Sequence, residues 1–259
     1  MPAEFDYSFR EHPVPFKSAS QTARVWTEEW VVRQMYCPAC GEVSLRGLPN
    51  NAPVADFHCD NCSEIFELKS TKSQFGRKIV DGAYQTMINR LQSHSVPNLM
   101  LMTYDASRSH VTSLIVVPSQ FITPSIIEKR KPLASTARRA GWQGCNILWS
   151  DVPAMARIGL VENQVAKPIG EVLDNWSRLK FVKDTSYAAR GWLFEVWHCI
   201  ETLGRPEFTL SELYGFEQVL SQKYPDNKNI RAKIRQQLQV LRDANFLMFL
   251  GLGRYLVRQ

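Results

Sequence analysis

Residues 53–70 read PVADFHCDNCSEIFELKS, and this stretch predicts a β-hairpin. Residues 54–59 and 64–70 have the pattern of two strands joined by a short turn. Because side chains alternate along a strand, Glu67 and Lys69 share one face and their apolar neighbours share the other. The hairpin therefore has one face for the core and one polar face that opens on a cleft.

The polar face carries residues that suit metal-dependent hydrolysis of a phosphodiester. The turn folds Asp56, on the first strand, back toward Glu67. Two carboxylates and a backbone carbonyl, that of Leu68, suit the oxygen coordination of Mg²⁺, and Lys69 would orient or activate the attacking water. Taken alone, this pattern more often marks an ion pair on a solvated strand face. The hairpin context and a basic segment downstream favour the hydrolase.

Four cysteines form two Cys-x-x-Cys pairs with eighteen residues between the pairs: Cys37 and Cys40, then Cys59 and Cys62. This spacing is typical of a Cys₄ zinc site, in which both thiolates of a pair point at one ion. Disulfides or free thiols are the alternative, and the lack of an apolar leader segment favours reduced cysteines. His58 could compete as a ligand, but four cysteines already fill a structural Zn²⁺ site.

The segments around the hairpin predict an α/β fold with a mixed sheet. Its elements are a helix over 18–34, the hairpin, a helix over 79–91, and strands over 99–104 and 114–118. The sequence turns polar over 162–185, so we place a domain boundary near Lys183. The expected domains are residues 1–182 and 183–259.

The second domain has the pattern of a winged helix. An amphipathic helix around Trp192 is followed by a capping box from Thr209 to Glu212, which begins a second helix. Asn227 or Asn229 can cap a third helix, and two short strands follow it. Three helices and a hairpin in this order are the winged variant of helix-turn-helix.

One face of the third helix is basic and lies about 100° from its apolar stripe. Residues on this face recur at spacings of three and four: Lys228, Arg231, Arg235, Gln239 and Arg242. Such a face can enter a major groove and read base edges, while Arg254 and Arg258 near the wing would reach phosphates. A solvated helix face is the alternative.

A second candidate DNA contact lies in residues 132–146, which we expect to be an ordered loop. Arg138 and Arg139 could clamp a phosphate, and Trp142 could insert into the base stack. A core tryptophan below a basic surface loop explains the same residues equally well.

Charge and composition agree with a polyanionic partner. The net charge is +6 and the pI about 9.0, and residues 223–259 hold eight Lys or Arg against two acids. We expect no membrane segment, a cytoplasmic location and a monomer in solution.

Several stretches resemble one family over nearly the whole chain. PVADFHCDNCSEIFELKS, DGAYQTM, KPLASTARRAGWQGCN and KIRQQLQVLRD are similar to the DpnI-like methyl-directed restriction endonucleases of the PD-(D/E)xK superfamily. The resemblance implies a nuclease domain with a Cys₄ zinc, a winged-helix domain, and cleavage of duplex DNA at GATC with N6-methyladenine. It also implies that Asp56, Glu67 and Lys69 are catalytic and that Arg138, Arg139 and Trp142 lie in a DNA-contacting region. Ala55 stands where the superfamily usually has proline.

Two other functions fit the residues. A zinc-bearing regulator would bind DNA through the winged helix and would not need Asp56, Glu67 and Lys69 on one cleft face. A repair nuclease of the same fold would use that cleft on structured DNA such as flaps.

Overall fold

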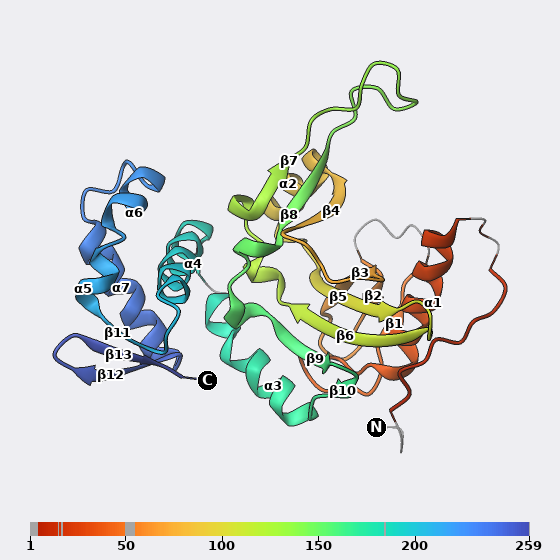
Figure 1. Cartoon of the computed structure of the whole chain (residues 1–259), viewed down its shortest axis with the longest axis horizontal. Helices are drawn as coiled ribbons and strands as arrows, with labels where there is room; N and C mark the ends of the chain where they lie inside the picture. Colours follow the sequence, from red (N-terminus) through yellow and green to blue (C-terminus); the bar gives the residue numbers. More distant parts are fainter. Residues whose placement is uncertain (1–4, 15, 17, 50–54, 184, 259) are drawn as a thin grey trace. The chain divides into compact units, whose positions relative to one another are not determined.

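Contacts divide the chain into two units, residues 1–179 and 180–259, in the computed structural model shown in Figure 1. The structure describes residues 5–14, 16, 18–49, 55–183 and 185–258. The expected strand start at Val54 lies outside these residues, and the first strand of the hairpin is β2, Phe57–His58.

The first unit is built on a seven-stranded mixed sheet with the order β1-β2-β3-β5-β6-β9-β10. Only the pairing of β3 with β5 is parallel among these strands. β3 therefore pairs with its hairpin partner on one side and with a crossover-connected strand on the other. The strands are β1 Arg46–Gly47, β2 Phe57–His58, β3 Ile65–Thr71, β5 Asn98–Asp105, β6 His110–Val117, β9 Ile158–Glu162 and β10 Val165–Ala166.

Along β3, Phe66 packs into the core as the sequence predicts, whereas Leu68, also expected there, is half-buried and is among the residues that line the cleft. Phe66 is fully buried, and its ring lies 6.3 Å from that of Trp176 in α3. Helix α1 (Ala19–Gln34) contacts β1 and β3, and α3 (Ile169–Arg178) contacts β9. The polar stretch over 162–185 thus holds a strand and a helix that the sequence analysis did not predict.

The crossover from β3 to β5 contains β4 (Lys78–Ala83) and α2 (Tyr84–Gln92). The predicted helix over 79–91 is therefore wrong in its first part. β4 pairs with β8 (Gly144–Leu148), which also pairs with β7 (Ile127–Lys129), so a second sheet of three antiparallel strands forms. Pairing with a distant strand outweighs the local helical periodicity of this segment.

Short 3₁₀ turns complete the connections. They are η1 Ser119–Phe121, η2 Pro124–Ile126, η3 Trp149–Asp151, η4 Ala154–Ala156 and η5 Lys180–Val182. In the described part of the chain, every helix is too short or too polar to cross a bilayer.

Among residues 180–183 and 185–258, the second unit has four α-helices where the sequence predicts three. The helices are α4 Tyr187–Thr202, α5 Leu210–Tyr214, α6 Glu217–Lys223 and α7 Ile230–Asp243. Strands β11 (Glu207–Thr209), β13 (Arg254–Val257) and β12 (Leu247–Gly251) form an antiparallel sheet in that order. The Thr209 capping box is present, and β12 with β13 forms the expected wing. The sequence analysis did not predict α6 and β11. Both are too short to show two full periods of the hydrophobic pattern of a helix or a strand.

Candidate functional site: an acidic cleft beside a four-cysteine cluster

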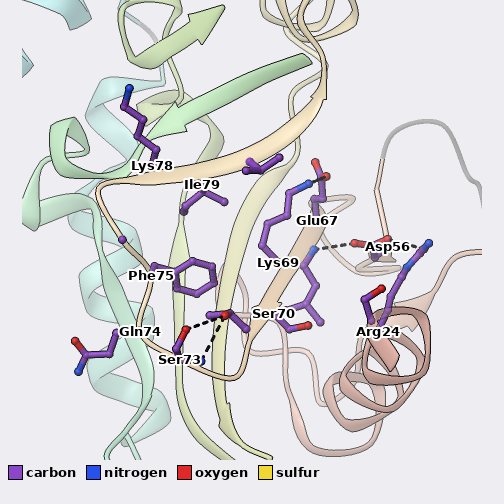
Figure 2. A pocket seen from close by; sticks show the side chains of 15 residues that line it. Arg24, Asp56, Glu67, Lys69, Ser70, Ser73, Gln74, Phe75, Lys78 and Ile79 are labelled. Carbon is purple, nitrogen blue, oxygen red and sulfur yellow. Dashed lines mark hydrogen bonds and ion pairs between the residues drawn. The ribbon is translucent and has the colours of Figure 1, made fainter. Parts of the chain in front are cut away.

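A cleft of about 750 Å³ opens along the polar side of β3. Its lining comes from α1, from the segment before β2, and from β3 and β4, and includes Arg24, Asp56, Glu67, Leu68 and Lys69. Figure 2 shows Glu67 and Lys69 on β3, with Asp56 and Arg24 on neighbouring segments. The three residues of the predicted catalytic set thus lie in one cleft.

Asp56 is fixed to β3 through both backbone and side chain. Its N–H donates to the carbonyl of Phe66 at 2.8 Å, and its Oδ2 accepts from the N–H of Leu68 at 2.8 Å. Within a strand, the N–H and C=O of one residue point to the same side. The carbonyl of Leu68 therefore lies on the Asp56 side of β3, where the sequence analysis places a metal ligand.

Arg24 of α1 approaches Asp56 from the opposite side, and the sequence analysis missed it. Its guanidinium lies 3.4 Å from Asp56 Oδ1 and also pairs with Glu28 at 2.5 Å, one helical turn away. The Arg24 side chain is half exposed in the cleft. A phosphate oxygen can therefore reach it from solvent.

Lys69 lies between two carboxylates. Its Nζ is 2.5 Å from Glu67 Oε1 and 2.7 Å from Asp81 Oδ1 of β4. The sequence analysis missed Asp81 because it assigned this segment to a helix. The pattern Lys78-Ile79-Val80-Asp81, with a β-branched pair before a glycine, was the available strand signal.

The neighbouring charges shift two pKa values in the cleft. Burial raises the pKa of Glu67, and the charges of Asp81 and Asp56 add to this, so that it stays above its ordinary value despite Lys69. Burial lowers the pKa of Lys69, but Glu67 and Asp81 outweigh it and raise the net value. Lys69 is therefore an ammonium donor at neutral pH rather than a base.

The donor set of the cleft fits a hard divalent cation. Asp56 and Glu67 provide carboxylate oxygens, and a bound cation would offset the repulsion that raises the Glu67 pKa. With Asp81 and Glu28, four carboxylates pair with two cations, Lys69 and Arg24. One more positive partner is therefore electrostatically favoured.

The four cysteines gather at the end of the hairpin. They are the only group of three or more His, Cys, Asp or Glu in the described ranges whose ligand atoms lie within 4.8 Å of one another. Cys37 Sγ lies 3.6 Å from Cys62 Sγ, and Cys40 Sγ lies 3.6 Å from Cys59 Sγ. A tetrahedral zinc with Zn–S of about 2.3 Å requires about 3.8 Å between sulfurs, whereas a disulfide requires about 2.05 Å. The cluster fits zinc.

The two cysteine pairs adopt the same backbone turn. In the first pair, the N–H of Cys37 donates to the carbonyl of Glu42, and the N–H of Gly41 donates to the carbonyl of Cys37, both at 2.8 Å. In the second pair, Cys59 makes the same two bonds with Glu64 and Ser63, both at 2.9 Å. The residue at the fourth position, Gly41 or Ser63, has a positive φ of 82° or 61°. These repeated knuckles aim both thiolates of a pair at one point.

The predicted loop contact lies apart from the cleft lining. Arg138, Arg139 and Trp142 belong to the loop between β7 and β8, which projects from the small sheet in Figure 1. Arg139 stacks on the Trp142 ring at 4.8 Å, and a Cβ built on Gly144 would lie 2.9 Å from that ring. Trp142 is half-buried on its own loop, while both arginines are exposed.

Helix α7 presents its predicted polar face to solvent. Arg231, Arg235, Gln239 and Arg242 are exposed, whereas Ile234, Leu238 and Leu241 are fully buried. Lys228 precedes α7, contrary to its expected place on the helix, and donates to the carbonyl of Pro225 at 3.0 Å. Tyr214 supports the face, because it bonds Arg235 at 2.7 Å and stacks under Arg231.

An acidic, lysine-bearing cleft on a mixed α/β unit, followed in the chain by a helix-turn-helix unit, is typical of an enzyme that cuts DNA. Residues 1–185 match the DpnI family model, described as the Dam-replacing family, and residues 188–256 match its DpnI_C model, the Dam-replacing HTH domain. The chain belongs to the Dam-replacing family and is a DpnI-like methyl-directed endonuclease.

Proposed function

We propose that this endonuclease hydrolyses both strands of duplex DNA at GATC sites whose adenine carries an N6-methyl group, and that it requires Mg²⁺. The observation that carries the proposal is the convergence of Asp56, Glu67, Leu68 and Lys69 in one cleft. A regulator that only binds DNA has no use for this arrangement, which uses the PD-(D/E)xK set of residues.

Asp56, Glu67 and the carbonyl of Leu68 would hold the Mg²⁺. The ion supplies an activated water and stabilises charge on the phosphate that is attacked. Asp56 is oriented for this role by the Leu68 N–H, so the carboxylate needs little rearrangement. Lys69 remains protonated and donates to the attacking water or a phosphate oxygen. Arg24 would release Asp56 and pair with a phosphate oxygen of the bound DNA.

The cysteine cluster would bind one structural Zn²⁺, since all four ligand positions belong to the protein. We retain the boundaries of the sequence analysis, a nuclease domain over 1–182 and a winged-helix domain over 183–259. Arg138, Arg139 and Trp142 in the first domain, and Lys228, Arg231, Arg235 and Gln239 in the second, would contact the DNA. The enzyme would act in the cytoplasm as a monomer.

Selectivity for one methyl group needs more than one contact. Burial of a methyl group contributes about 0.8 kcal/mol, which discriminates only a few-fold. Two readings of the modified base, one by each domain, would multiply this factor. We propose that selectivity comes either from such a double reading or from a penalty against the unmethylated base.

A plasmid-cleavage experiment tests the proposal. One plasmid is prepared from a host that methylates adenine in GATC and from a host that does not, and each is incubated with the protein and Mg²⁺ or with EDTA. We expect Mg²⁺-dependent fragments that end at GATC from the methylated plasmid alone. Equal cutting of the two plasmids, or cutting of neither, contradicts the proposal. Preferential cutting of unmethylated flap DNA would identify a repair nuclease instead.

A further inference from the structure

Asp81 contacts the cleft residue Lys69, although it does not line the cleft and is not part of the aspartate and Glu-x-Lys pattern. Its side chain is 8% exposed, and its Oδ1 is 2.7 Å from Lys69 Nζ. Lys69 is its sole ion-pair partner within the described residues. A carboxylate this buried and paired with a single ammonium orders that ammonium strongly.

The backbone directs Asp81 at Lys69. Asp81 pairs with Cys145 of β8 and Ala83 pairs with Gly144, so Gly82 is an extra residue in β4. Such a bulge bends a strand and changes the direction of the neighbouring side chain. The thiol of Cys145 donates a hydrogen bond to the carbonyl of Gly82 at 3.5 Å and so contacts the bulge.

A role as metal ligand is less consistent with the geometry. The residues that line the cleft include Asp56, Glu67 and Leu68, the proposed ligands, but not Asp81. Its Oδ1 accepts a hydrogen bond from Lys69 Nζ at 2.7 Å. Asp81 is therefore placed to fix the position of the Lys69 ammonium.

We propose that Asp81 is a positioning residue that holds the Lys69 ammonium in its catalytic orientation when Glu67 turns to a divalent cation. This inference rests on the proposed hydrolytic function. Lys69 has two carboxylate partners in the structure, and a metal ion competes for one of them, Glu67. Asp81, on a different strand, keeps its contact. Without it, the flexible lysine chain would spread over several rotamers.

Cleavage kinetics test this role. Asp81→Asn keeps the size of the side chain and removes its charge, and we expect the single-turnover rate on methylated duplex to fall about 10- to 100-fold while DNA affinity stays within about twofold. Glu128→Gln is the matched control, because Glu128 pairs with Lys78 of the same strand β4 and does not touch Lys69. Its rate should equal that of the wild type. A wild-type rate for both Asp81→Asn and Asp81→Ala overturns the proposal.

A double-mutant cycle separates positioning from a structural role. If Asp81 acts through Lys69, then Asp81→Asn has no further effect on the residual activity of Lys69→Gln. If it lowers that activity by its full factor, Asp81 acts through general stability and the proposal fails. The double variant must be compared at equal folded fraction, which circular dichroism reports.

A readout without cleavage distinguishes this proposal from failure of the proposed function. Reductive methylation of lysine amines, followed by mass spectrometry, measures how often Lys69 Nζ is free of its partners. We expect Asp81→Asn to raise the Lys69 modification rate about tenfold and Glu128→Gln to leave it unchanged. An unchanged rate in Asp81→Asn overturns the proposal even if the protein cuts no DNA.

Discussion

The N–H of Leu68 donates a 2.8 Å hydrogen bond to Oδ2 of Asp56, so a residue of β3 orients a carboxylate that lies twelve positions earlier. A charge-assisted bond of this kind is shorter and stronger than a neutral one. It leaves Asp56 Oδ1, which faces Arg24 at 3.4 Å, as the oxygen available to a cation.

Removal of this carboxylate charge should stop cleavage. We expect Asp56→Asn to lower the cleavage rate on the order of 10³-fold or more, because a neutral amide holds a divalent cation poorly. DNA affinity without Mg²⁺ should stay within about threefold of the wild type. Asp60→Asn is the control, since Asp60 is exposed in the turn of the same hairpin and pairs with Arg46 of β1. If Asp56→Asn cleaves DNA at the wild-type rate, the proposed role of Asp56 as a metal ligand is wrong.

Loss of one cysteine of the cluster should release zinc and unfold the hairpin. For Cys59→Ser we expect less than half of the wild-type zinc by elemental analysis and a fall in stability of several kcal/mol, on the order of a structural site's contribution. Cys199→Ser should keep its zinc, because Cys199 lies in the other unit, outside the cluster. A stable, active and zinc-free Cys59→Ser protein would refute a structural zinc.

The raised pKa of Glu67 predicts how metal binding depends on pH. The carboxyl must be ionised to hold a cation, and burial places its pKa above the ordinary 4.5. As pH falls, the affinity for Mg²⁺ should therefore be lost at a higher pH than it would be with a glutamate of ordinary pKa. Lys69 lowers the Glu67 pKa, so Lys69→Met should move the loss of affinity to still higher pH. Calorimetric titration of Mg²⁺ at several pH values measures both effects, and a shift toward lower pH in Lys69→Met would contradict them.

The basic face of α7 should contribute to DNA affinity. We expect Arg235→Ala to weaken duplex binding by about 1–3 kcal/mol if the arginine reads a base, or to reduce the salt slope by about 1 if it contacts a phosphate. Fluorescence anisotropy at several salt concentrations distinguishes these results. Lys233→Ala removes the same charge from another part of the helix, where Lys233 is half-buried and bonded to Gln236. Equal effects of the two variants would show that total charge alone matters.

Local patterns in the sequence predicted the hairpin and the grouping of its polar and cysteine side chains. Alternation along Ile65–Thr71 placed Glu67 and Lys69 on one face, and the Cys-x-x-Cys spacing predicted the cluster. Both signals depend on residues close in sequence. The same holds for the Thr209 capping box and the apolar stripe of α7.

Features that depend on distant pairing were not predictable in this way. Residues 79–83 have helical periodicity, but they form a strand because β8, more than sixty residues later, pairs with them. Asp81 was missed for that reason, since its contact with Lys69 joins strands of two different sheets. Arg24 was missed because a helix pattern does not show which turn faces Asp56.

The pairing of β4 with β8 also determines how much of the chain must be synthesised before the cleft can assemble. Asp56, Glu67, Lys69 and Asp81 leave the ribosome early, yet the strand that fixes β4 ends only at Leu148. A nascent chain therefore carries all its cleft residues well before it can hold them in place. The segment made in between includes the loop with Arg138 and Arg139. The order of synthesis thus delays the assembled cleft until after this loop has been made.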